Sequence, residues 1–172
     1  MATTYLNIKG DRLKAIADDF AVTQKQIDLA CKRAISKLAR HLKTIALRNI
    51  SELTGIKQTV IRRRVFLSLN GQRQTARIWF GVYAIPLREM NPRQTRTGVR
   101  AGKIERNHAF IQQKNGGPEV YRRVDDRRKP IAIQYARIES EVSSVIDADV
   151  LKAFDKKFYV FFEREIKWES SK

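Results

Sequence analysis

The most regular pattern along the chain is an apolar stripe between residues 23 and 51. Its members recur at steps of three and four residues, the spacing that places side chains on one face of an α-helix. Thr23 is the candidate N-cap of this long helix, which we expect to end near Ser51. The predicted stripe consists of Ile27, Cys31, Ala34, Leu38, Leu42 and Ile45.

The C-terminal segment shows the same helical spacing with larger side chains. Asp147 is the candidate cap of a helix that continues to about Trp168. An aromatic stripe at this spacing is more often part of a core than a ligand site, so we expect it to pack against the long helix or on one face of a sheet. Its members are Val150, Leu151, Phe154, Phe158, Phe161, Phe162 and Ile166.

Alternation of apolar and polar residues predicts several β-strands. Asn70-Gly71 lies in the link between two of these runs, and the cluster 114–118 separates two others, so each pair is expected to form a hairpin. Pro130 opens the last run, a position that tolerates its missing N–H. The predicted strands are 65–69, 75–83, 110–113, 120–124 and 131–135, with a short strand at 4–9 that is followed by a helix at 11–20.

Residues 86–107 contain few large apolar side chains and several dispersed basic ones. This pattern is typical of a long polar loop or of a hairpin arm that projects from the body, with room for two weak strands around Ala101-Gly102. Together the elements predict one α+β domain over 1–172. We expect a mainly antiparallel sheet of about four to six strands, packed by the long helix and the C-terminal helix.

Charge changes this picture more than any other aspect of composition. The chain has 35 Lys and Arg against 18 Asp and Glu, a formal net charge of +17. The excess is uneven, because residues 24–129 hold 25 basic and 7 acidic side chains, whereas the residues from Ile138 onward hold 6 and 8. Like charges in such excess repel one another and destabilise the folded protein, so the excess indicates an acidic partner.

The candidate contact residues are basic side chains of the long helix, of the segment that follows it and of the arm. The polar face of the helix carries almost only positive charge, where a solvated face would normally mix both signs. We expect these residues to act as counter-charges for DNA phosphates or for acidic patches on neighbouring proteins. They are Arg33, Lys37, Arg40, Arg48, Arg62, Arg63, Arg64, Arg93, Arg96, Arg100, Lys103 and Arg106.

The residue patterns indicate neither an enzyme nor a metal or cofactor site. His41 and His108 lie far apart in sequence, and three basic residues after Asp125-Asp126 favour a salt-bridged turn there. The chain has no HExxH pattern and no phosphate-binding glycine loop. Cys31, the single cysteine, excludes an internal disulfide and is expected to be buried. No apolar run approaches the roughly 20 residues of a membrane-spanning helix.

Residues 108–146 carry a specific resemblance to a known family. An alternating strand at 109–113, the turn Lys114-Asn115-Gly116 and a second strand at 120–124 precede Pro130-Ile131. This order resembles the lambdoid phage minor tail protein Z family, whose members are tail-completion proteins at the head-proximal end of long tails. Over the rest of the chain the resemblance is in the order of elements, the length and the basic character.

The resemblance implies a structural protein of the virion. Such a protein completes the tail top, helps to join it to the head and positions the genome end in the tail channel. The resemblance also implies a homo-oligomeric ring, with a hexamer as the expected form, beside tail terminator, tail tube or head-completion proteins. Genomic DNA in the channel would meet Lys and Arg without base contacts. The expected location is the host cytoplasm during assembly and then the head-proximal end of the tail.

A different function is indicated by residues 50–64, which resemble the helix-turn-helix of transcriptional repressors. Gly55 would make the turn, and Ile56 and Val60 would pack inward. The residues that would read the major groove are Lys57, Gln58, Thr59 and Arg62. The simpler interpretation is a helix end, a glycine corner and a short second helix. A regulator would prefer one duplex sequence strongly, whereas a ring subunit would bind any duplex in a salt-dependent way.

Overall fold

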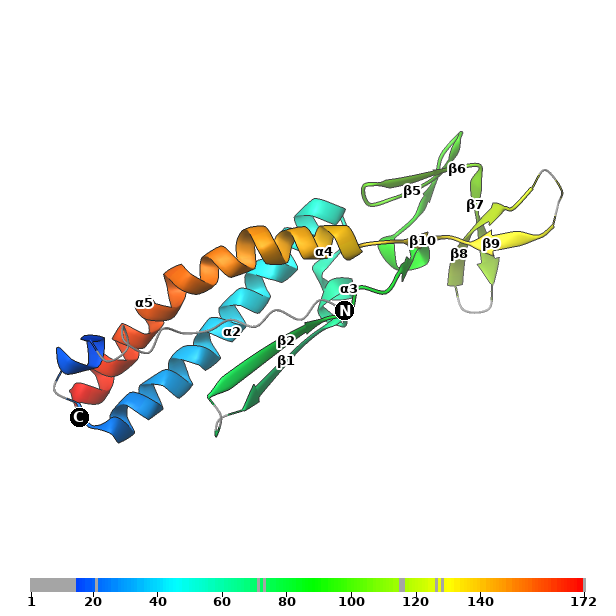
Figure 1. The fold of residues 1–172 in the computed structure, drawn as a ribbon. Coiled ribbons are helices and arrows are strands. Elements are labelled where there is room, and N and C mark those ends of the chain that lie inside the picture. The colour runs from blue at the N-terminus through cyan, green and yellow to red at the C-terminus, as the bar shows by residue number, and fades with distance from the viewer. Residues whose placement is uncertain are drawn as a thin grey trace. The chain divides into compact units, whose positions relative to one another are not determined.

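The chain folds into helices and small antiparallel sheets, which confirms the predicted α+β class. Figure 1 shows the order of these elements along the chain. The predicted strand at 4–9 lies outside the described residues, and a helical turn at 15–18 is described within the predicted helix at 11–20. The computed structural model describes residues 15–20, 22–70, 72, 74–114, 117–125, 127 and 129–171, without the side chains of Lys114 and Asp155.

The chain packs as two compact units, and each unit draws on separate stretches of sequence. The helical unit contains residues 1–46, 65–80 and 145–172, and the sheet unit contains residues 47–64 and 81–144. The long helix α2 (Gln24–Thr54) contributes residues to both. The single domain over 1–172 stays a prediction.

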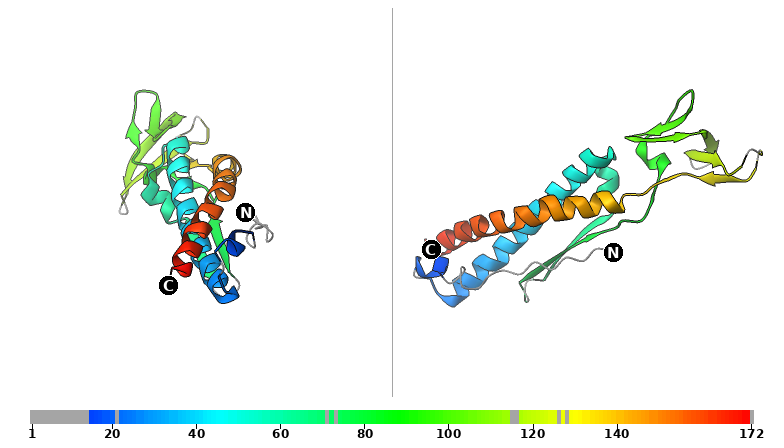
Figure 2. Two further views of the ribbon diagram at one scale, coloured as in Figure 1. Left: turned by 90° about the vertical axis from the view of Figure 1, so that its left-hand side faces the viewer. Right: turned by 45° about the horizontal axis from the view of Figure 1, so that its top comes forward.

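The core of the helical unit lies between α2 and α5 (Leu151–Ser170), which lie side by side in Figures 1 and 2. Most of the α2 stripe and the last part of the α5 stripe are confirmed as inward faces, whereas Ile27, Ile45, Leu151, Phe154 and Phe161 are half-buried. On α2 the buried members are Cys31, Ala34, Leu38 and Leu42, and on α5 they are Phe158, Phe162 and Ile166. Alanines at 30, 39 and 46 of α2 are buried as well, and such small side chains let a neighbouring helix approach closely.

The first turn of α2 confirms the predicted cap. The Thr23 carbonyl accepts hydrogen bonds from the N–H groups of Gln26 (3.0 Å) and Ile27 (3.1 Å). In return, the Gln26 side-chain oxygen accepts a hydrogen bond from the Thr23 N–H at 2.9 Å. The Gln26 side chain thus supplies its half of a capping box, while the Thr23 hydroxyl donates to the same Gln26 oxygen at 2.8 Å.

The start of the C-terminal helix differs from the prediction. The helical backbone of α4 (Glu139–Val145) continues through a π-helical turn (Ile146–Val150) into α5. The predicted cap at Asp147 is therefore wrong, because this residue lies inside the π turn. A π turn accommodates one extra residue, which rotates the apolar face and keeps Ile146 and Val150 both buried.

β1 (Val65–Asn70) and β2 (Thr75–Phe80) form the predicted hairpin of the helical unit. Leu67 lies opposite Ile78 on the half-buried face of this ribbon, and Phe66 lies opposite Trp79 on the other face. The Phe66 and Trp79 rings are 5.5 Å apart between centroids, although the two residues are 57% and 38% exposed. Among the described residues, the ribbon therefore leaves an aromatic pair exposed.

The sheet unit contains the end of α2, the short helix α3 (Gln58–Arg62) and, in its described residues, three antiparallel sheets ordered β3–β10, β4–β5–β6 and β7–β8–β9. With β1–β2, the described strands thus form four small sheets, not one sheet of four to six strands. Several strands are only two to four residues long, and turns interrupt them before a wider sheet can form. The bounds are β3 (Ile85–Pro86), β4 (Arg93–Gln94), β5 (Gly98–Ala101), β6 (Ile104–Asn107), β7 (Ala109–Lys114), β8 (Gly117–Arg123), β9 (Ile131–Ile133) and β10 (Tyr135–Ala136), with a 3₁₀ turn at Leu87–Met90.

Residues 86–107 contain the hairpin β5–β6, which confirms the two strands predicted around Ala101-Gly102. Val99 and Ala101 of this hairpin are buried, as is Leu87 in the turn that precedes it. Gly102 has a positive φ of +60°, and a Cβ on it would lie 2.7 Å from the carbonyl oxygen of Gly55. The hairpin is therefore packed into the sheet unit at the corner where α2 ends.

Candidate functional site

The predicted contact residues divide between the two units. The helical unit holds Arg33, Lys37 and Arg40 on α2. The sheet unit holds Arg48, Arg62, Arg63, Arg64, Arg93, Arg96, Arg100, Lys103 and Arg106. What each of these side chains can do depends on its neighbours, because a cation that already pairs with a carboxylate has less to offer another anion.

Arg33 and Lys37 pair with carboxylates of α5 in the helical unit. Arg33 forms an ion pair with Glu169, and Lys37 forms one with Glu165. Both carboxylates are nearly inaccessible, with 4% and 7% of their side-chain surface exposed. Since a buried carboxylate without a cation is costly, the first task of Arg33 and Lys37 is to hold α2 and α5 together.

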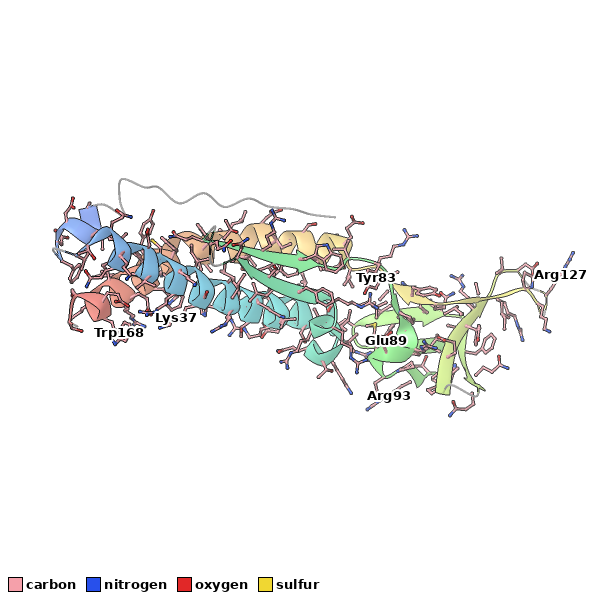
Figure 3. All side chains as sticks on the ribbon, turned by 90° about the horizontal axis from the view of Figure 1, so that it is seen from below. Lys37, Tyr83, Glu89, Arg93, Arg127 and Trp168 are labelled. Carbon is pink, nitrogen blue, oxygen red and sulfur yellow. The ribbon has the colours of Figure 1, made fainter. Side chains whose placement is uncertain are left out.

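The two ion pairs belong to a regular row along the helix pair. A step of four residues forward along α2 corresponds to a step of four backward along α5, and the next step brings His41 against Phe161 with ring centroids 5.8 Å apart. Arg33 also lies over the Trp168 ring, with 4.4 Å from its guanidinium carbon to the ring centroid. Figure 3 labels Lys37 and Trp168 on these two helices. The row fixes an antiparallel register for α2 and α5.

Arg40 and Arg48 remain exposed on α2. Arg48 lies 3.8 Å from a carboxylate oxygen of Glu52, but both side chains are more than 60% exposed, so the pair is largely solvated. Arg40 has no side-chain hydrogen bond or ion pair with any described residue. Both guanidinium groups are thus accessible to an anion from outside.

Three consecutive arginines lie at the end of α3 and just after it, and the structure gives them different environments. Arg62 and Arg63 are exposed. Arg64 is only 7% exposed; its guanidinium donates a hydrogen bond to the Tyr83 carbonyl (3.0 Å) and lies 4.1 Å from the centroid of the Tyr83 ring. Arg64 is therefore a structural residue of the sheet unit, and Arg62 and Arg63 remain as contact residues.

The sheet β4–β5–β6 places two arginines directly opposite each other. Arg93 pairs with Arg100 across β4 and β5, and Arg100 lies opposite Glu105 on β6 with 3.6 Å between Nε and the carboxylate. One carboxylate therefore faces two guanidinium groups in this row. Like charges at opposite positions destabilise a sheet, so the row would be stabilised by an anion from outside. Arg93 is labelled in Figure 3.

The remaining predicted residues of the arm have mixed environments. Lys103 donates a hydrogen bond to the Glu52 carbonyl at 2.6 Å, and Arg106 donates a long one, 3.4 Å, to the Tyr135 carbonyl. Arg96 lies in the turn between β4 and β5, is exposed, and has no side-chain partner among the described residues. Lys103 thus serves the packing of its own unit, whereas Arg96 remains available.

Three arginines of the sheet unit, Arg88, Arg122 and Arg123, were not predicted as contact residues. Arg88 forms an ion pair of 2.9 Å with the buried carboxylate of Glu119. Arg122 and Arg123 are exposed at the end of β8 and have no side-chain partner among the described residues. Arg122 and Arg123 could have been found from the sequence as two adjacent arginines in a predicted strand. None of the residues opposite them on the neighbouring strands is acidic: Ala109 and Ala132 face Arg122, and Ile131 faces Arg123.

The segment 50–64 contains the predicted corner, with Gly55 at φ +72° and Val60 and Ile61 buried after it. The helix beyond the corner, α3, has five residues. A recognition helix of a repressor uses a longer face to reach several bases. The regulator function stays a prediction, and the geometry of α3 offers it little support.

Within the described part of the chain, no three His, Cys, Asp or Glu side chains come together as a metal site. No described helix is long and apolar enough to cross a membrane. No known protein family, curated protein or solved structure matches this chain. The likeness to the tail protein family therefore stays a prediction from the sequence of residues 108–146.

Proposed function

We propose that this protein is a structural component of a bacteriophage tail. In this proposal it lies at the head-proximal end, completes the tail and helps to join it to the head. Several copies form a ring beside tail terminator, tail tube or head-completion proteins, and the basic surface contacts genomic DNA without reading its sequence. The proposal rests on the resemblance over 108–146 and on the charges described above.

The observation that carries the proposal is a set of exposed arginines without acidic partners. Arg40, Arg62, Arg63, Arg93 and Arg96 are exposed, and none has an ion pair among the described residues. They come from a helix, a corner and a sheet, so they do not form the single reading element of a sequence-specific DNA-binding protein. Dispersed cations of this kind neutralise phosphates wherever DNA passes and carry no base information.

The exposed ribbon β1–β2 supports the multi-subunit part of the proposal. Phe66 and Trp79 form an exposed aromatic pair on it, and aromatic side chains are enriched at contacts between subunits. In the proposed ring the aromatic pair contacts the neighbouring copy, and the exposed arginines remain accessible to DNA.

The DNA contact is tested by reversing charge at four of the arginines. Arg40→Glu, Arg62→Glu, Arg63→Glu and Arg93→Glu are combined in one variant, and a matched variant carries Lys at the same positions. Binding to two unrelated duplexes is measured by fluorescence anisotropy over a salt series. We expect equal affinity for both duplexes, a loss of binding in the Glu variant, and retention in the Lys variant, because phosphate contacts need charge more than shape.

The tail function is tested with the same two variants in phage particles that require this protein. We expect the Glu variant to form the same oligomer as the unchanged protein, measured by native mass spectrometry, but to fail in head–tail joining or DNA delivery. Normal delivery with the Glu variant would overturn the proposal. Loss of the oligomer would instead assign these arginines to contacts between subunits.

A further inference from the structure

The sheet unit contains a basic cavity, of whose arginines only Arg96 belongs to the contact residues named above. The cavity has a volume of about 600 Å³ and lies where the β4–β5 turn meets β7 and the end of β8. Three arginines and one histidine are among its lining residues, namely Arg96, His108, Arg122 and Arg123. It is open to solvent, because most of its lining residues, including the three arginines, are exposed.

The charge of the cavity is almost entirely positive. Asp125 is the one acidic residue among the described residues that line it, and a carboxylate oxygen of Asp125 already accepts a hydrogen bond from the Arg127 N–H at 2.9 Å. Arg96, Arg122 and Arg123 have no side-chain hydrogen bond or ion pair with any described residue. In this they resemble Arg62, Arg63 and Arg93 and differ from Arg64, Arg88 and Arg100, which have partners; what sets them apart is that they line one cavity.

The backbone around the cavity is held by the side chains of Thr95 and Gln94; the Thr95 hydroxyl donates to the Gly98 carbonyl (3.0 Å) and accepts from the Gly98 N–H (3.1 Å). The Gln94 amide joins three separate strands. Its amide nitrogen donates to the carbonyls of Gly98 (2.9 Å) and Ala109 (3.3 Å), and its oxygen accepts from the Ile111 N–H (3.0 Å). The His108 N–H donates to the Thr97 carbonyl at 2.9 Å. These bonds join the β4–β5 turn to β7, so the backbone at Arg96 is held beside the strands that carry the other cations.

Close approach of strands fixes the same corner. A Cβ on Gly98 would lie 2.1 Å from the carbonyl oxygen of Arg106, so the glycine lets β5 and β6 come together at this point. On β8, Arg122 lies between Ala109 of β7 and Ala132 of β9. These small neighbours leave its long side chain without a bulky group beside it in the row. The wall is thus built of tightly bonded backbone, and the cations project from it.

We propose that this cavity binds a phosphoryl group. Each guanidinium presents several N–H donors in a planar fork, which suits the oxygens of a phosphate. Three such groups exceed what one carboxylate can satisfy, whereas a phosphate or pyrophosphate offers enough oxygens and charge to engage all three. The three positively charged arginines repel one another, and this repulsion is relieved when an anion binds between them. The inference does not rest on the proposed function, because it concerns binding by the isolated protein.

Two sources supply this ligand chemistry, a free phosphate compound and the backbone of a nucleic acid. Calorimetric titration with inorganic pyrophosphate tests the first, and anisotropy with a labelled DNA duplex tests the second. The test variant is Arg96→Gln/Arg122→Gln/Arg123→Gln, in which three cations of the cavity are lost. The matched control combines Arg77→Gln, Arg127→Gln and Arg137→Gln, three exposed arginines that do not line the cavity.

We expect the unchanged protein and the control to bind alike, and the cavity variant to lose about tenfold in affinity for each guanidinium removed. Pyrophosphate binding that depends on the cavity identifies a free phosphate compound as the source; cavity-dependent binding of the duplex alone identifies the nucleic acid backbone. Acetate at the same concentration should not compete. Circular dichroism confirms that each variant is folded, and Lys at the three positions serves as a milder variant if the Gln variant is not.

Three results would overturn the inference. The first is that neither pyrophosphate nor the duplex binds the unchanged protein. The second is that the cavity variant and the control lose affinity equally, since that outcome reflects net charge alone. The third is that acetate competes as well as phosphate does, which would show that the cavity does not distinguish a phosphoryl group.

Discussion

The guanidinium of Arg33 on α2 pairs with the buried carboxylate of Glu169 on α5, while its carbon lies 4.4 Å from the centre of the Trp168 ring. Lys37 makes the equivalent pair with Glu165 one helical turn further along α2. Two cations that sequence analysis assigns to an external anion therefore have partners within their own unit. The helix pair owes its register to charge as well as to its apolar stripe.

The Lys37–Glu165 pair should respond asymmetrically to mutation. In Lys37→Met the buried carboxylate of Glu165 loses its cation, and we expect the free energy of unfolding to fall by about 1–3 kcal/mol. In Glu165→Gln the loss should be smaller, because the Lys37 side chain is 56% exposed and water can solvate it. Urea denaturation of both single variants and of Lys37→Met/Glu165→Met measures this. Equal losses in the two single variants would contradict the assignment.

The three consecutive arginines at the end of α3 should differ in a stability measurement. Arg64→Gln removes the contact with the Tyr83 ring and the hydrogen bond to its carbonyl, so we expect a loss of about 1–2 kcal/mol. Arg62→Gln and Arg63→Gln serve as controls, and exposed substitutions of this kind usually change stability by less than about 0.5 kcal/mol. Thermal denaturation checks the result. If all three variants melt together, Arg64 has no structural role.

Two glycines of the sheet unit allow a matched test of close packing. Gly102→Ala introduces a Cβ at 2.7 Å from the Gly55 carbonyl oxygen, in addition to the strain of a positive φ. Gly117 also has a positive φ, but a Cβ there would meet nothing within 4 Å. We expect Gly117→Ala to cost about 1–2 kcal/mol and Gly102→Ala to cost clearly more. Chemical denaturation distinguishes them, and a Gly102→Ala loss no larger than the Gly117→Ala loss would argue against the close approach.

Cys31 confirms the prediction of a buried thiol and makes stability depend on pH. Burial, with a smaller effect from Asp28, raises the pKa of the thiol to about 11. The thiol therefore keeps its proton to higher pH in the folded protein than in the unfolded chain. The contribution of the protonated thiol to the free energy of unfolding is fully present below pH 9 and is lost as pH rises to about 11.

The check is a comparison of unfolding free energies with Cys31→Ala across that range. The unchanged protein should lose stability faster than the variant above pH 9. At pH 8 the thiol of the folded protein should react with a maleimide far more slowly than in denaturant, because the reactive thiolate is scarce and covered. Rapid labelling of the folded protein would contradict the burial.

Local patterns determined much of the architecture. The helix predicted from Thr23 to Ser51 is observed as Gln24–Thr54. It was predictable because its signals, the apolar spacing and the Thr23–Gln26 cap, each involve residues that are close in sequence. The β1–β2 and β7–β8 hairpins were predictable for the same reason, since alternation and turn residues are local. The π turn escaped prediction, because Asp147 has the side chain of a cap and nothing in its neighbours signals continuation of the helix.

Contacts between distant segments decided which charges are free. Arg62, Arg63 and Arg64 are equivalent by sequence, and only the position of Tyr83 makes one of them buried. Glu165 and Glu169 lie more than a hundred residues from Lys37 and Arg33, so no local pattern could assign those pairs. Arg96, Arg122 and Arg123 meet around one cavity because hydrogen bonds from Gln94 join separate strands. The sequence by itself determined how much positive charge the protein carries, and tertiary structure decided which cations are neutralised, since neutralisation depends on distances that only folding sets.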